Sequence, residues 1–105
     1  DVRDMGIDVQ LRQENVEVLD EVADPRMVLP RATRNSFSGT RLLKYVVPWG
    51  DAVFNQAQAD DLAADIRRVK VANPGSALFE ILSAVEPLVE RLSREVHVYL
   101  WFVGD

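Results

Sequence analysis

His97 is the only imidazole in the chain, so any histidine-based acid–base or nucleophilic chemistry would have to use it. A catalytic triad would also need a nucleophile and a carboxylate, and the sequence contains no cysteine, no Ser-plus-Asp pattern near His97 and no Gly-x-Ser-x-Gly elbow. We therefore interpret His97 as a half-buried sheet residue in line with Tyr99 and Trp101. The sequence favours a protein without catalytic activity, and a small enzyme that uses His97 is kept as an alternative.

Metal and phosphate sites find little support in the residue spacing. Asp61 and Asp65 lie four residues apart on an expected helix, but no histidine or third carboxylate follows at ligand spacing. We interpret both as solvated carboxylates that complement the helix dipole. The segment 38–41, Ser-Gly-Thr-Arg, lacks the Gly-Lys-Ser/Thr ending of a phosphate loop. We expect no metal and no cofactor.

One segment, residues 26–45, is basic and contains no acidic residue, with Phe37 and Tyr45 between its charges. Arginine forks bind phosphate and aromatic rings stack on bases, so this segment is a candidate nucleic-acid or anion site. Its candidate residues are Arg26, Arg31, Arg34, Arg41 and Lys44. We keep this function as a second alternative, because acidic residues elsewhere weaken the field that the segment projects.

The chain as a whole is acidic, with a net charge of −5. Carboxylates concentrate in the first 25 residues, where a rigid sheet could present them to a basic partner, with aromatic side chains as anchors. The candidate partner-binding residues are Asp8, Glu17, Asp20, Trp49, Tyr99 and Trp101. The sequence therefore favours a non-enzymatic protein-binding module, with a basic protein as the expected partner and nucleic acid as a less favoured one.

These residues must be positioned by strands in the first half of the chain. Alternation of apolar and polar residues over 5–12 and 16–22 predicts a hairpin. A two-residue turn at Glu14-Asn15 would place Arg12 opposite Glu17 and Leu11 opposite Val18, but Glu is not a preferred first turn residue, so a longer turn is the alternative. Pro25 and Pro30, which follow the hairpin, predict a long loop. Alternation predicts a third strand over Arg41–Val47, and residues 48–51, Pro-Trp-Gly-Asp, predict a turn.

Two helices are predicted next. Asn55 with Gln58 forms a capping box ahead of an apolar stripe at Leu62, Ile66 and Val69. A second helix is expected to begin at Ser76 and to continue through Leu92, with Pro87 inside it.

The C-terminal segment 96–103 is apolar on both faces, which predicts a strand in the middle of the sheet. Val96, Val98, Leu100 and Phe102 are expected to face the helices, with His97, Tyr99 and Trp101 on the other face. The predicted fold is α+β, a single domain over 1–105 with a mostly antiparallel sheet of about four strands and two helices on one face. The exposed face that this leaves makes a homo-oligomer a further expectation.

No apolar run approaches the eighteen or so residues that span a membrane, so we expect no membrane association and a cytoplasmic location. The opening Met-Gly-Ile-Asp-Val-Gln-Leu (5–11) and the closing His-Val-Tyr-Leu-Trp-Phe-Val-Gly-Asp (97–105) resemble small uncharacterised bacterial proteins with such a strand at each end. In size, acidity and element order the chain is similar to bacterial immunity proteins, which neutralise toxins, often basic nucleases. That resemblance implies an inhibitor of a basic partner and assigns no residues.

Overall fold

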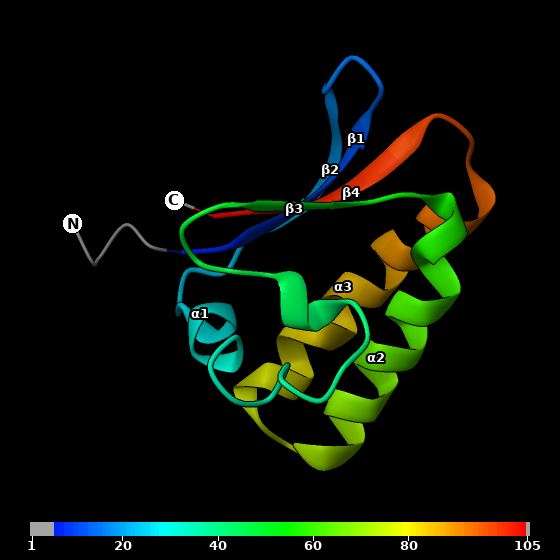
Figure 1. Cartoon of the computed structure of the whole chain (residues 1–105). Coiled ribbons are helices and arrows are strands. Elements are labelled where there is room, and N and C mark those ends of the chain that lie inside the picture. The colour runs from blue at the N-terminus through cyan, green and yellow to red at the C-terminus, as the bar shows by residue number, and fades with distance from the viewer. Residues whose placement is uncertain (1–5, 105) are drawn as a thin grey trace.

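Four antiparallel strands form one sheet in the computed structural model, which describes residues 6–104 (Figure 1). They are β1 (Asp8–Gln13), β2 (Val18–Val22), β3 (Asp51–Phe54) and β4 (Val98–Val103). Their order is β2-β1-β4-β3, so the C-terminal strand lies in the interior of the sheet, as its two apolar faces predict. This confirms the α+β fold class.

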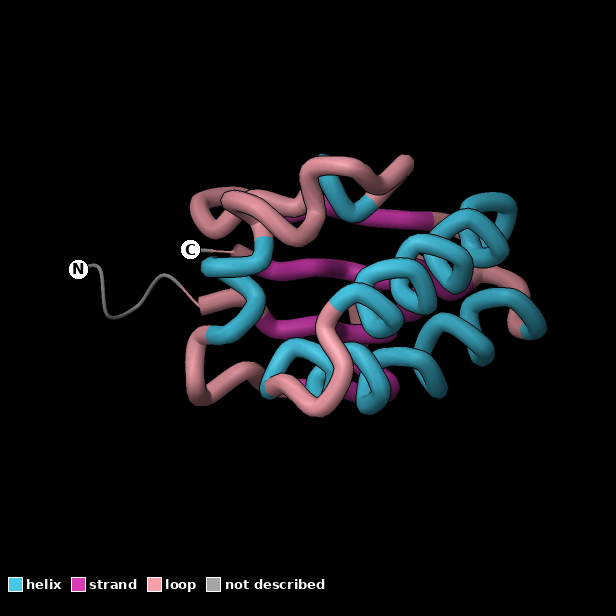
Figure 2. The backbone as a smooth tube through the Cα atoms, turned by 90° about the horizontal axis from the view of Figure 1, so that it is seen from below, coloured by secondary structure: helices cyan, strands magenta, loops and turns pink. Residues whose placement is uncertain are grey.

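The helices all lie against one face of the sheet (Figures 1 and 2). The two long ones, α2 (Ala59–Ala72) and α3 (Ala77–Arg94), pack side by side, and the short α1 (Val28–Ala32) contacts α3. Two single 3₁₀ turns, η2 (Leu43–Tyr45) and η3 (Gln56–Gln58), complete the layer. No described helix covers the opposite face of the sheet (Figure 1).

Local capping explains where the long helices begin. Asn55 and Gln58 form the expected capping box, although its first turn is the 3₁₀ turn η3. The hydroxyl of Ser76 accepts a hydrogen bond from the Phe79 backbone N–H at 3.0 Å, which caps α3. The helix α3 continues through Pro87 to Arg94.

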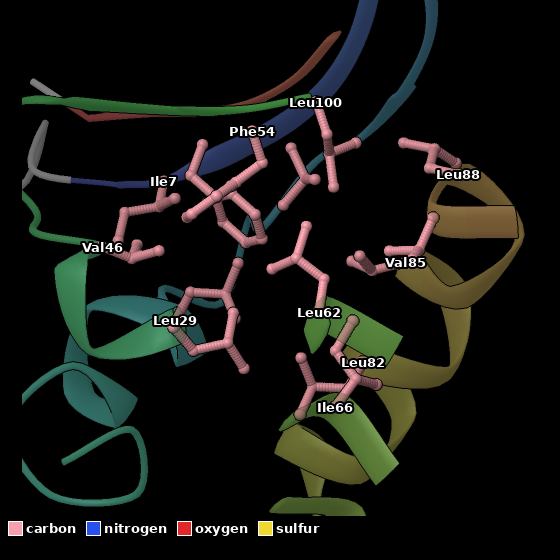
Figure 3. Packing of buried hydrophobic residues seen from close by; sticks show 14 of the residues in the cluster. Ile7, Leu29, Val46, Phe54, Leu62, Ile66, Leu82, Val85, Leu88 and Leu100 are labelled. Carbon is pink, nitrogen blue, oxygen red and sulfur yellow. The ribbon is translucent and has the colours of Figure 1, made fainter. Parts of the chain in front are cut away.

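The core lies between the helices and the sheet (Figure 3). Leu100 and Phe102 of β4 are fully buried, and the Phe102 ring meets the Phe54 ring edge-on at 5.8 Å between centroids. The apolar stripe of α2, with Leu62 and Ile66, is buried against them. The alternation and the helical periodicity therefore identified the buried faces correctly.

The third strand was predicted at the wrong place. Residues 41–47 contain the 3₁₀ turn Leu43–Tyr45, and the strand is Asp51–Phe54, which includes the end of the predicted turn. The carboxylate of Asp65 on α2 accepts hydrogen bonds from the backbone N–H groups of Arg41, Leu42 and Leu43 at 3.0, 2.8 and 3.2 Å. Because these three N–H groups donate to a side chain, they do not donate to a neighbouring strand, and the segment does not form a strand.

The hairpin exists, with the longer turn and not in the register that a two-residue turn would give. Leu11 lies opposite Asp20 and Arg12 opposite Val18, with an irregularity that leaves Leu19 as an extra residue. The turn is longer than two residues and contains Val16 at φ 63°. The predicted hairpin begins at Met5, which lies outside the described residues.

The start of the last strand also differs from expectation. The strand begins at Val98, and Val96, predicted to face the helices, is 67% exposed in the preceding turn. His97 has a left-handed φ of 61° and is exposed, so its interpretation as a half-buried strand residue was wrong. The helices within residues 6–104 are all too short or too polar to cross a bilayer.

Candidate functional site

The uncovered face of the sheet carries three rows of side chains that the strand register brings together. In the central row Glu21, Gln10, Trp101 and Val53 lie side by side across all four strands. A second row contains Val18, Arg12 and Tyr99, and a third contains Asp8, Val103 and Asp51. We call these ten residues the open face.

An ordered network fixes the centre of the open face. The guanidinium of Arg12 lies over the Trp101 ring at 4.2 Å from its centroid. The Arg12 Nε–H donates to Gln10 Oε1 at 2.8 Å, and the Gln10 amide donates to the Glu21 carboxylate. These contacts link Trp101, Arg12, Gln10 and Glu21 across β4, β1 and β2.

Apolar and acidic groups divide the open face between them. Val18 and Val53 are 46% and 43% exposed, and Tyr99 and Trp101 between them are half-buried. The margins carry carboxylates: Glu21 on one edge strand, Asp51 on the other, and Asp8 at the end of β1. With Arg12 as its one base, the open face is net negative.

The six predicted partner-binding residues do not form one surface. Asp8, Tyr99 and Trp101 lie on the open face, while Glu17 lies in the β1–β2 turn. Trp49, which is 69% exposed, lies in the loop before β3, where the Gly104 N–H donates to the Gly50 carbonyl at 3.1 Å.

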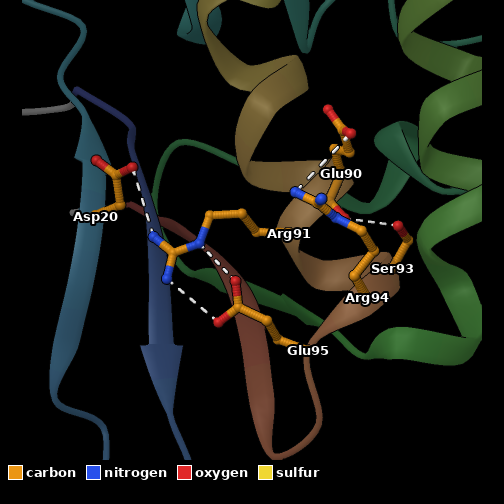
Figure 4. Close-up of polar contacts among 6 residues, drawn as sticks. All are labelled: Asp20, Glu90, Arg91, Ser93, Arg94 and Glu95. Atoms are coloured by element: carbon orange, nitrogen blue, oxygen red, sulfur yellow. Dashed lines mark hydrogen bonds and ion pairs between the residues drawn. The ribbon is translucent and has the colours of Figure 1, made fainter.

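Asp20 lies on the helix-facing side of β2. Its carboxylate is 3.8 Å from Nη1 of Arg91 on α3, and Arg91 also forms a two-pronged pair with Glu95 at 2.7 and 3.2 Å (Figure 4). The hydrogen bond from Arg91 lowers the pKa of Glu95, and the same contact raises the pKa of Arg91. Asp20 and Asp8, both candidate partner-binding residues, therefore lie on opposite faces of the sheet.

Seven of the ten open-face residues were not among the predicted candidates, and two of them, Asp51 and Val53, lie on a strand that was not predicted. Both were placed in or beside the predicted turn over 48–51, because β3 is only four residues long and follows a proline and a glycine. A β-branched residue next to an aromatic one, Val53 and Phe54, was the available strand signal.

The five predicted anion-binding residues are all exposed, on α1, η2 and the turns around them. Arg41 lies 3.4 Å from the Asp61 carboxylate, and Lys44 lies over the Tyr45 ring at 5.3 Å. Because Asp65 fixes the backbone at 41–43, the segment is tied to α2 rather than loose.

His97 lines a shallow cavity of about 460 Å³ at the hairpin end of the sheet. Its Nδ1 lies 3.3 Å from the Glu14 carboxylate, and both side chains are largely exposed. None of the residues lining the cavity has a hydroxyl, thiol or amine; they are Gln13, Glu14, Asn15, Leu19, Glu95, Val96, His97 and Val98. The histidine therefore has a carboxylate beside it and no hydroxyl or thiol among the residues that line the cavity.

The carboxylates on α2 have separate roles. Asp65 is buried, at 4% exposure, with its oxygens occupied by backbone N–H groups, so its interpretation as a solvated residue was wrong. Asp61 is exposed, as expected. Within residues 6–104 no group of three or more histidine, cysteine, aspartate or glutamate side chains is placed to hold a metal ion.

No protein-family model matches the chain, and no curated protein or solved structure is significantly similar to it.

Proposed function

We propose that this protein is a non-enzymatic binding module whose open face binds a basic protein partner. The observation that carries the proposal is the aromatic centre of the open face, ordered by Arg12 and bordered by the carboxylates of Asp8, Glu21 and Asp51. Rigid aromatic anchors surrounded by charge are the usual composition of protein-binding hot spots. The carboxylates supply the long-range attraction that speeds association with a basic surface.

The same features disfavour nucleic acid on this face. Sheets that bind single strands present free aromatic rings to the bases, whereas the guanidinium of Arg12 already lies over the Trp101 ring. The carboxylates of Asp8 and Asp51, at the margins of the open face, would also repel phosphates. A protein surface with lysine or arginine side chains at its rim complements both features.

We propose that the binding of this module inhibits its partner. An acidic face that covers the active site of a basic enzyme would pair with the positive side chains that bind the anionic substrate. The substrate would then be excluded. The proposal extends the likeness to immunity proteins from element order to a surface, and it assigns Asp8, Tyr99 and Trp101 to the contact.

The test is an affinity capture from source-cell lysate, with and without nuclease treatment, using the unmodified protein and two charge-reversed variants. Asp8→Lys changes the open face, and Glu90→Lys makes the same charge change on α3, in the helix layer, where Glu90 is exposed. We expect a basic protein retained in stoichiometric amount by the unmodified protein and by Glu90→Lys, and lost from Asp8→Lys. Equal retention by both variants, or retention of nuclease-sensitive material alone, would contradict the proposal.

A further inference from the structure

The two edge strands of the sheet differ in whether their outward backbone groups are free. Along β1, the N–H of Gln13 donates to the Glu17 carbonyl across the hairpin, so Leu11 also directs its backbone groups toward β2. Asp20, which lies opposite Leu11, therefore directs its backbone N–H and C=O groups toward β1. The next residue, Glu21, directs its backbone groups outward from the edge of the sheet. The Glu21 N–H donates to the Asp20 carboxylate at 2.8 Å, so this outward donor is already occupied.

The β3 edge has the opposite property. The Gly104 N–H donates to the Gly50 carbonyl, and because alternate residues face the same neighbour, Ala52 and Phe54 pair with β4. Asp51 and Val53 therefore direct their backbone N–H and C=O groups outward. No described residue forms a hydrogen bond with the backbone of Val53 across this edge. An exposed strand with free donors and acceptors is a template for one more strand.

From this difference we propose that β3 accepts an extended basic segment of the partner as a fifth strand. The proposal rests on the proposed function, because the added strand would extend the open face by one strand beside Asp51 and Val53. Backbone hydrogen bonds would supply affinity, and alternate side chains would supply specificity.

The side chains of β3 define the chemistry of that segment. Val53 is 43% exposed and calls for an apolar residue opposite it, while Asp51, two residues earlier on the same face, calls for lysine or arginine. The fitting segment therefore carries a basic and an apolar residue two positions apart, on the same face of the strand. A second copy of the chain fits less well, since two chains of net charge −5 repel each other.

The test uses a synthetic capped peptide of repeated Lys-Thr-Val-Thr, which places lysine and valine two positions apart on one face, and two N-methylated forms of it. One form is methylated on the backbone nitrogens of every lysine and valine, and the other on the backbone nitrogens of every threonine. In a strand added to β3 only one of these sets faces the protein, so we expect one form to bind like the parent and the other to lose about tenfold or more in affinity. Equal binding of both forms would show that charge alone retains the peptide and would overturn the proposal.

Two protein variants locate the site. Val53→Pro removes an outward N–H without removing a ladder bond, and proline is tolerated at such edge positions. Val53→Thr keeps the N–H and the branched side chain. We expect Val53→Pro to lose about tenfold in affinity for the parent peptide and Val53→Thr to stay within about twofold.

Amide hydrogen exchange of the unmodified protein provides a readout without substitution. Peptide should protect the Val53 N–H and leave the exchange of the Glu21 N–H unchanged. Protection of Val53 that rises with protein concentration in the absence of peptide would assign the edge to a second copy and overturn the proposal. If Asp8→Lys abolishes partner capture while Val53→Pro does not, the open face binds without strand addition and only this inference fails.

Discussion

The guanidinium carbon of Arg12 lies 4.2 Å from the centroid of the Trp101 ring, on a face of the sheet that no described helix covers. Arg12 is held there by its hydrogen bond to Gln10, so the stack is part of the folded structure. The half-buried state of Trp101 follows from this stack.

Arg12→Gln should release the Trp101 ring. We expect a loss of about 1 kcal/mol in the free energy of unfolding and greater quenching of Trp101 fluorescence by acrylamide. The measurement needs Trp49→Phe as background in both proteins, because Trp49 is exposed and would dominate the signal. Arg12→Lys keeps the charge without the planar guanidinium. Its stability and its acrylamide quenching should lie between those of the Arg12 protein and those of Arg12→Gln. Unchanged quenching in Arg12→Gln would mean that the stack does not order Trp101.

Asp65→Ala should be strongly destabilising, because three backbone N–H groups at 41–43 lose their acceptor. We expect a loss on the order of 3 kcal/mol in the free energy of unfolding, measured by urea denaturation. Asp61→Ala is the matched control: it lies one turn earlier on α2, is half-exposed, and should change stability by less than about 0.5 kcal/mol. Similar losses in the two variants would contradict the assigned role of Asp65.

The Arg91–Glu95 contact should make part of the stability depend on acid pH. Because the pKa of Glu95 is lowered in the folded protein by the hydrogen bond from Arg91, ionised Glu95 stabilises the fold above its unfolded pKa of about 4.3. That contribution is lost as the pH falls through the lower, folded value. Carboxyl ¹³C shifts followed by NMR should show the Glu95 midpoint rising in Arg91→Met. A midpoint that does not move would assign the lowered pKa to another cause.

Elements whose determinants are close in sequence were predicted well. The capping pairs Asn55 with Gln58 and Ser76 with Phe79 act within three residues. The apolar stripes of the helices that begin there, α2 and α3, are long. The two-sided apolar character of Val98–Val103 similarly predicted an interior strand.

Elements decided by distant contacts were not predicted. The alternation in 41–47 is a real strand signal, but Asp65, more than twenty residues away, takes the N–H groups that a strand would need. With that segment removed from the sheet, the edge position passes to the four residues of β3.

The candidate site was predicted in part for a related reason. Asp8, Tyr99 and Trp101 follow simple alternation and share one face. Asp20 follows the irregularity at Leu19, and an extra residue in one strand shifts all later side chains by one position relative to the partner strand. No local pattern in 16–22 marks where that residue is inserted.

The hydrogen bond from the Glu21 N–H to the Asp20 carboxylate also limits how far the sheet can grow. A molecule with two receptive edges can join copy after copy into a filament, because each addition exposes a new edge of the opposite kind. The outward Glu21 N–H of β2 is already bonded within its own strand, so β3 is the edge with the free donor. Growth that uses β3 alone would end after a single addition.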